Sequence, residues 1–172
     1  KLAWIINIVA LIIAVLMVVP ALLLVPFSLS FSDDYNQLLM NVVKPLLLLP
    51  SMVAYMVLHE LVHGFFFKRF SGVKPFYGFT GLYAYAGSNA FLGKRDYLIV
   101  TLSPVVLFGL LFLLLNFIVP LDWFWSVYIL QVINISGAAG DAYITGVMCR
   151  MPADVLTRDI GVTMLIYSKE KP

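Results

Sequence analysis

Long apolar runs separated by short polar stretches organise this chain. Residues 3–25 are almost continuously apolar, and at about 1.5 Å per residue a helix of that length crosses a hydrocarbon core of about 30 Å. Apolar runs recur over 45–70, 96–119 and 124–147. The pattern predicts four transmembrane helices. We expect the first to be a retained span, because a signal peptide has a shorter apolar core.

Prolines and charges mark the expected irregularities of these spans. Lys44, Pro45 and Pro50 interrupt the start of the second run, so a short interfacial helix is expected to lead into span two, which begins near 45 or 51. Pro20 and Pro104 predict kinks in spans one and three.

The segment between spans two and three, 71–93, is rich in glycine and aromatic residues. Two short aromatic runs, 76–79 and 82–86, are separated by Thr80 and Gly81, which predicts a β-hairpin or a re-entrant loop. Such backbone cannot face lipid, so it must be buried in protein or line a wet cavity.

Composition agrees with an all-α polytopic membrane protein. Of 172 residues, 62% are hydrophobic and 12% charged. We expect one membrane-embedded domain over 1–150 and a cytoplasmic tail over 151–172, with a turn at Asp159 and a short strand over 163–167. The lone Cys149 excludes an internal disulfide. The expected surroundings are a lipid bilayer, with no nucleic-acid partner, and the oligomeric state is open.

The basic residues set the expected orientation. Four spans place both termini on one side, and a polar turn over 28–37, with Asp33 and Asp34, on the other. Positive charge in short loops marks the cytoplasmic face. Lys44 alone falls opposite, so both termini and the aromatic segment are expected in the cytoplasm with the remaining basic residues: Lys1, Lys68, Arg69, Lys74, Lys94, Arg95, Arg150, Arg158, Lys169 and Lys171.

Candidate chemistry lies inside span two, in the H-E-x-x-H motif of residues 59–63. The chain has two histidines, and both are in this motif. On a helix, His59 and His63 share one face and can offer two imidazole nitrogens to one ion, while Glu60 takes a proton from the metal-bound water. An alternative is a helix whose polar residues hydrogen-bond to its neighbours, although ionisable groups at membrane depth mark a functional site by default.

A catalytic zinc needs a third protein ligand and an open position for water. If Lys68 and Arg150 both lie near the cytoplasmic interface, His59 and Asp141 are each nine residues inside it, about 13 Å deep. The other acidic residues lie at the surface or on the wrong side, and Cys149 lies about two turns above His59. Asp141 is therefore the predicted ligand. Its alternative role is to pair with a hydroxyl or amide of a neighbouring helix.

Asn134 lies seven residues before Asp141 and so shares its helix face. It could hold a substrate carbonyl or stabilise the oxyanion, or it could hydrogen-bond another helix. Gly137 and Gly140 would let this span approach the helix that carries the motif.

These residues resemble the site-2 protease type of membrane-embedded zinc metallopeptidases, and most closely a group of small bacterial zincin peptidases of that type. The resemblance covers about residues 45–150. It implies a zinc-dependent endopeptidase of the bacterial cell membrane, with Asp141 as ligand, although Ala142 follows where the family usually has glycine. It also implies a strand near the site that pairs with an extended substrate, a role that 76–86 match by position, with Tyr83 and Tyr85 as candidate substrate contacts. The same segment could instead be a plug that only shields the site.

The expected function is hydrolysis of peptide bonds in membrane or membrane-proximal proteins near the cytoplasmic face, with Zn²⁺ as cofactor. The alternative is a non-catalytic metal-binding scaffold or substrate-capture protein, which predicts a closed four-ligand site. A metal transporter is less favoured, because one polar cluster near one face provides no path across the membrane.

Overall fold

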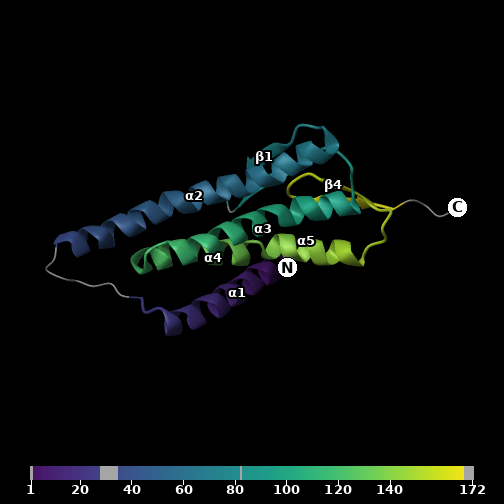
Figure 1. Cartoon of the computed structure of the whole chain (residues 1–172). Helices are drawn as coiled ribbons and strands as arrows, with labels where there is room; N and C mark the ends of the chain where they lie inside the picture. Colours follow the sequence, from purple (N-terminus) through teal and green to yellow (C-terminus); the bar gives the residue numbers. More distant parts are fainter. Residues whose placement is uncertain (1, 28–34, 82, 169–172) are drawn as a thin grey trace. The chain divides into compact units, whose positions relative to one another are not determined.

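The computed structural model describes residues 2–27, 35–81 and 83–168, and it is mostly helical (Figure 1). Asp33 and Asp34 of the expected polar turn lie outside the described residues, as do Lys1, Lys169 and Lys171 of the charge argument.

Among the described residues, three helices are long and apolar enough to cross a membrane: α1 (Leu2–Leu24), α2 (Tyr35–Ser71) and α3 (Lys94–Ile118). The expected break at the start of span two is wrong, because α2 continues through Pro45 and Pro50. Each proline removes one N–H from the helix ladder, but away from water a continuous helix still satisfies more backbone groups than a broken one.

The fourth span expected over 124–147 is not a single helix. After a 3-10 turn, η1 (Leu121–Trp123), the chain forms two shorter helices, α4 (Phe124–Gly137) and α5 (Ala139–Arg150), interrupted at Ala138. Neither has the roughly 20 residues that a full crossing needs. Gly137 and Gly140 flank the interruption, and glycine is among the poorest helix formers.

The chain divides into two compact units, one formed by 1–55 with 108–139 and the other by 56–107 with 140–172. In the first unit α1 packs against α4. The hydroxyl of Tyr128 donates to the carbonyl of Met17 at 2.9 Å, and the rings of Phe27 and Trp125 meet edge to face at 5.7 Å. These contacts hold the first span of the chain against a later helix.

The second unit contains two small antiparallel sheets. The predicted hairpin is confirmed: β1 (Phe76–Phe79) pairs with β2 (Ala84–Gly87). The second sheet has the order β3-β4-β5, formed by β3 (Leu92–Gly93), β4 (Leu156–Asp159) and β5 (Met164–Tyr167). Strand β5 confirms the short strand expected near the C-terminus, whereas β3 and β4 were not anticipated.

The core of the second unit joins helices and strands that are far apart in sequence. Its most buried side chains are at most 3% exposed and come from α2, β3, α3, α5 and the C-terminal segment: Phe67, Leu92, Tyr97, Val100, Met148 and Val155. Val155 and the equally buried Thr157 show that the segment after α5 is packed into this unit.

Candidate metal centre

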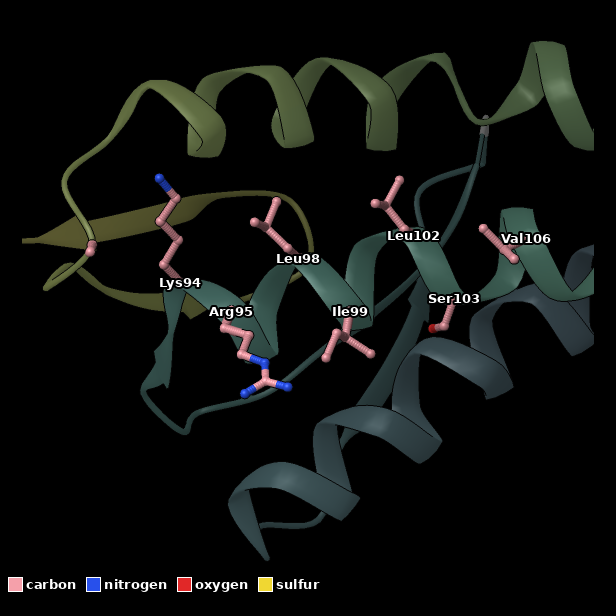
Figure 2. Close-up of a pocket in the computed structure, with 8 residues that line it drawn as sticks. Lys94, Arg95, Leu98, Ile99, Leu102, Ser103 and Val106 are labelled. Atoms are coloured by element: carbon pink, nitrogen blue, oxygen red, sulfur yellow. The ribbon is translucent and has the colours of Figure 1, made fainter.

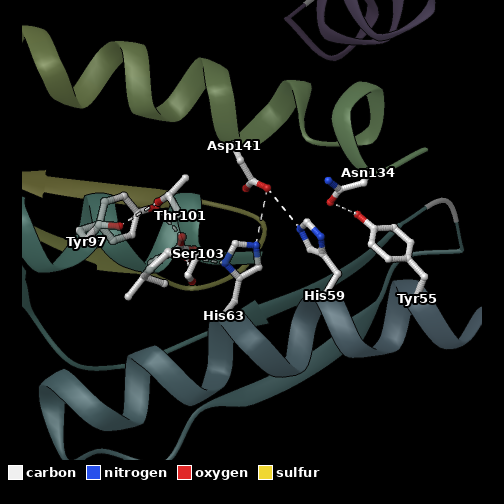
Figure 3. A network of polar contacts seen from close by, with 10 residues as sticks. Tyr55, His59, His63, Tyr97, Thr101, Ser103, Asn134 and Asp141 are labelled. Carbon is white, nitrogen blue, oxygen red and sulfur yellow. Dashed lines mark hydrogen bonds and ion pairs between the residues drawn. The ribbon is translucent and has the colours of Figure 1, made fainter. Parts of the chain in front are cut away.

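The two histidines of the motif lie on one side of α2. The helix runs without interruption through residues 59–63, so residues four apart stand one above the other. The ring centroids of His59 and His63 are 4.9 Å apart, and both imidazoles point toward Asp141 (Figure 3). The local sequence therefore sets two of the three candidate ligands.

Asp141, in the first turn of α5, completes the group. Its Oδ2 atom lies 3.3 Å from Nε2 of His59 and 3.6 Å from Nε2 of His63. The side chains of His59, His63 and Asp141 are 12%, 10% and 21% exposed, so the group is largely enclosed. The structure thus brings together the two histidines of the motif and the aspartate that was predicted from its depth in the membrane.

The two separations between Asp141 and the imidazoles fit a zinc ion. A charge-assisted hydrogen bond between imidazole and carboxylate is about 2.7–2.9 Å long, which is shorter than both observed separations. Ligands about 2.0–2.1 Å from a tetrahedral zinc stand about 3.3–3.4 Å apart, close to both. Among the residues that the structure describes, this is the one group of His, Cys, Asp and Glu compact enough to hold an ion, with its ligand atoms within 4.8 Å of one another.

A backbone carbonyl orients His63. The Nδ1 atom of His63 lies 2.9 Å from the carbonyl oxygen of Val100 in α3, so Nδ1–H donates there and Nε2 is left for a metal. The hydroxyl of Ser103 donates to the same oxygen at 2.9 Å. Sequence reasoning missed Val100, because a carbonyl acceptor carries no residue-type signal.

Glu60 stands beside the group without belonging to it. Its carboxylate lies close to the backbone N–H of Ala86 in β2 and interacts electrostatically with both imidazoles and with Asp141. The hairpin therefore lies beside the acidic residue of the motif. A carboxylate that is near the ligands but is not one of them suits a proton acceptor.

Tyr77 of β1 reaches the helix at the residue after the motif. A Cβ atom on Gly64 would lie 2.6 Å from Cζ of Tyr77, so any larger residue there would force the phenol to move. Glu60 is one turn earlier on the same helix face. Burial of the phenol and the negative charge of Glu60 raise the pKa of Tyr77, which keeps it protonated at neutral pH. A glycine directly after the motif was the available signal for this contact.

The C-terminal turn supports the hairpin. The hydroxyl of Tyr97 donates to Oδ2 of Asp159 at 2.6 Å, and the backbone N–H of Gly161 donates to Oδ1 at 2.8 Å. The N–H of Ser88, directly after β2, donates to the backbone carbonyl of Asp159 at 2.7 Å. Burial raises the pKa of the Asp159 carboxyl. Asp159 thus connects α3, the end of β2 and the C-terminal segment.

The remaining candidate residues have other surroundings. Tyr83 is half exposed in the hairpin turn. The ring of Tyr85 lies over Gly78 on the paired strand and over Gly161, where a Cβ atom would overlap it. Asn134, in the first unit, is fully buried and accepts a hydrogen bond from the Tyr55 hydroxyl at 2.9 Å. That bond corresponds to the interhelical alternative raised for Asn134 from the sequence.

Two histidines and an aspartate at zinc-ligand spacing, with a glutamate beside them, define the class of zinc-dependent hydrolases that carry H-E-x-x-H on a helix. Residues 52–156, more than half of the chain, match the family described as "Putative zincin peptidase", and the chain belongs to that family. The match contains every residue of the metal group and ends three residues before Asp159. No curated protein and no solved structure matches the chain.

Proposed function

We propose that this protein is a membrane-embedded zinc metalloprotease of the site-2 protease type, which cleaves membrane or membrane-proximal proteins near the cytoplasmic face. The observation that carries the proposal is the group of His59, His63 and Asp141 at zinc-ligand spacing. Its two histidines lie on a helix that is long and apolar enough to cross a membrane. Membership of a zincin peptidase family supports the same chemistry.

The roles of the chain's residues follow from their positions. A zinc ion held by the three ligands would supply a Lewis acid that lowers the pKa of water toward 7 and polarises the scissile carbonyl. Glu60 accepts the proton of the attacking water and passes it to the leaving amine. The backbone N–H of Ala86 lies close to the Glu60 carboxylate. The carbonyl of Val100 keeps His63 in the tautomer that leaves Nε2 free.

The β1–β2 hairpin is the proposed substrate platform. Within the part of the chain that the structure describes, β1 and β2 pair only with each other, so neither strand carries a further strand on its outer edge. A peptide that unwinds at the site loses its helical hydrogen bonds, and pairing with a strand edge replaces them. The half-exposed ring of Tyr83 stands at the turn of this platform.

We propose that residues 124–150 form the fourth membrane crossing, interrupted at Ala138, which places both termini in the cytoplasm. Broken helices at membrane depth are tolerated where they line a wet cavity or are buried in protein. The interruption lies three residues before Asp141. A wet cavity at this point would supply the water that hydrolysis at the metal group needs.

The test uses purified protein in liposomes with labelled single-span peptides, and cleavage is read by mass spectrometry. Glu60→Gln is expected to retain zinc and to abolish cleavage, because the amide cannot accept the proton. Cleavage at the wild-type rate in the pure variant would show that Glu60 has another role.

A non-catalytic zinc scaffold is the competing function, and the number of protein ligands separates the two. The three-residue group leaves a tetrahedral ion one position for water. X-ray absorption of the zinc-loaded protein is expected to show three protein ligands and one oxygen from solvent. Four protein ligands would favour the scaffold.

A further inference from the structure

A groove runs along one face of α3 in the second unit, separate from the three metal ligands. Its volume is about 610 Å³, and its wall is aliphatic except for Lys94, Arg95 and Ser103. Figure 2 shows Lys94 and Arg95 at one end of the row of side chains and Val106 at the other. The groove is therefore apolar along its length and basic at one end.

The basic end of the groove carries positive charge that can bind an anionic ligand. Arg95 is exposed and forms no hydrogen bond or ion pair with any described residue. The Nζ atom of Lys94 donates to the carbonyls of Cys149 at 3.1 Å and Met151 at 2.7 Å, which uses two of its three N–H groups and fixes its charge beside the groove. Asp96, in the same turn, does not line the groove. A free guanidinium favours the planar, two-point recognition of a phosphate.

The length of the groove matches one membrane leaflet. Arg95 and Val106 are eleven residues apart on α3, a rise of about 16 Å, whereas half of a hydrocarbon core is about 15 Å thick. Between them the wall offers no unused hydroxyl, because the Ser103 hydroxyl donates to the Val100 carbonyl. A peptide backbone would find no partner there, but an acyl chain needs none.

We propose that this groove binds one anionic phospholipid, with its phosphate at Arg95 and Lys94 and an acyl chain along Leu98, Leu102 and Val106. The attraction at the basic end selects anionic over zwitterionic headgroups, and it weakens as salt is raised. This inference does not depend on peptidase activity.

The experiment measures lipids that stay bound to the full-length protein. The protein is reconstituted with phosphatidylcholine and a minor fraction of phosphatidylglycerol, extracted in mild detergent, and analysed by native mass spectrometry. Phosphatidylglycerol is expected to be enriched on the protein. Arg95→Gln is expected to reduce that enrichment about fivefold, since one basic residue at an anionic surface contributes about that factor.

Two matched controls test the location. Arg69→Gln removes the same charge from an exposed residue at the end of α2 that does not line the groove, and it is expected to leave the enrichment unchanged. Leu102→Trp fills the groove and is expected to lower retention of both lipids, whereas Leu110→Trp, at an exposed residue outside the groove, is not.

Equal losses in Arg95→Gln and Arg69→Gln would mean diffuse surface charge and would overturn the proposal. So would displacement of the phosphatidylglycerol by a single-span peptide with an acidic flank, because the groove would then be a peptide site. Either result leaves the Glu60→Gln test of the peptidase untouched.

Discussion

Replacing Asp141 by asparagine tests whether this residue is the third zinc ligand, the one that lies outside the H-E-x-x-H motif. Its Oδ2 atom approaches both imidazoles, at 3.3 Å from Nε2 of His59 and 3.6 Å from Nε2 of His63. Asparagine keeps the size and one oxygen but loses the charge that helps to neutralise a dication. Loss of a residue that only orients a ligand costs about 10- to 100-fold in metal affinity. Loss of a charged ligand should therefore cost at least about 100-fold, or about 2.7 kcal/mol.

Zinc affinity is measured by competition with a chromophoric chelator in detergent, together with the zinc content of the purified protein. Asp154→Asn is the matched control, because Asp154 is an exposed carboxylate of the same unit that does not belong to the group. Its zinc affinity should equal that of the wild type. Circular dichroism checks that the helices of both variants are intact.

An Asp141→Asn variant that binds zinc as tightly as the wild type would refute the ligand assignment. The observed spacing would then be that of a long ion pair between Asp141 and the histidines. A weak-binding Asp154→Asn control would instead point to a general loss of structure.

Three further predictions concern the shell around the centre. A Cβ atom at Gly146 would have nothing within 4 Å, so Gly146→Ala should stabilise α5 by up to about 1 kcal/mol. Gly64→Ala should not raise the free energy of unfolding in this way, and it should slow cleavage, because its Cβ displaces Tyr77. Equal stabilisation of the two variants in denaturant titrations would contradict the contact between Gly64 and Tyr77. Tyr97→Phe should lower the free energy of unfolding by about 1–3 kcal/mol, because the buried Asp159 loses a donor, and an unchanged unfolding midpoint would argue against that bond. Since the folded-state pKa of Asp159 is raised, its contribution to stability is complete below its unfolded pKa of about 3.9 and is lost as pH rises through the folded value. The unfolding free energy of the wild type relative to Asp159→Asn should therefore fall from pH 4 to pH 7, and a pH-independent difference would contradict the shift.

Sequence reasoning succeeded where the physical cause is local. The four-residue spacing of His59 and His63 places them on one face of any helix that contains them, and the aromatic runs around Gly81 fold as the expected hairpin. Sequence reasoning about breaks was less successful. Pro45 and Pro50 did not end a helix, since a long apolar segment satisfies its backbone best by remaining helical. Residues 124–147 looked continuous but are divided at Ala138.

The contacts around the centre required the folded chain. Tyr97 and Asp159 are 62 residues apart, and nothing in the sequence predicts that their side chains form a hydrogen bond. The acceptor of His63 is the carbonyl of Val100, a group that every residue possesses. The group that β2 brings close to Glu60 is likewise a backbone N–H, at Ala86. Glycines gave a partial signal, because Gly64 and Gly161 stand where aromatic rings of the hairpin need space.

By itself, the sequence determined the apolar segments, the two imidazoles and the acidic residue between them, because hydropathy and helical periodicity depend only on neighbours along the chain. It also narrowed the third ligand to one aspartate through charge and depth. Only the tertiary structure decided that Asp141 approaches both imidazoles, at 3.3 and 3.6 Å, and that the hairpin, bonded to the C-terminal turn, lies beside Glu60. Those distances depend on how α2, α3, α5 and the strands pack, and packing is a property of the whole second unit.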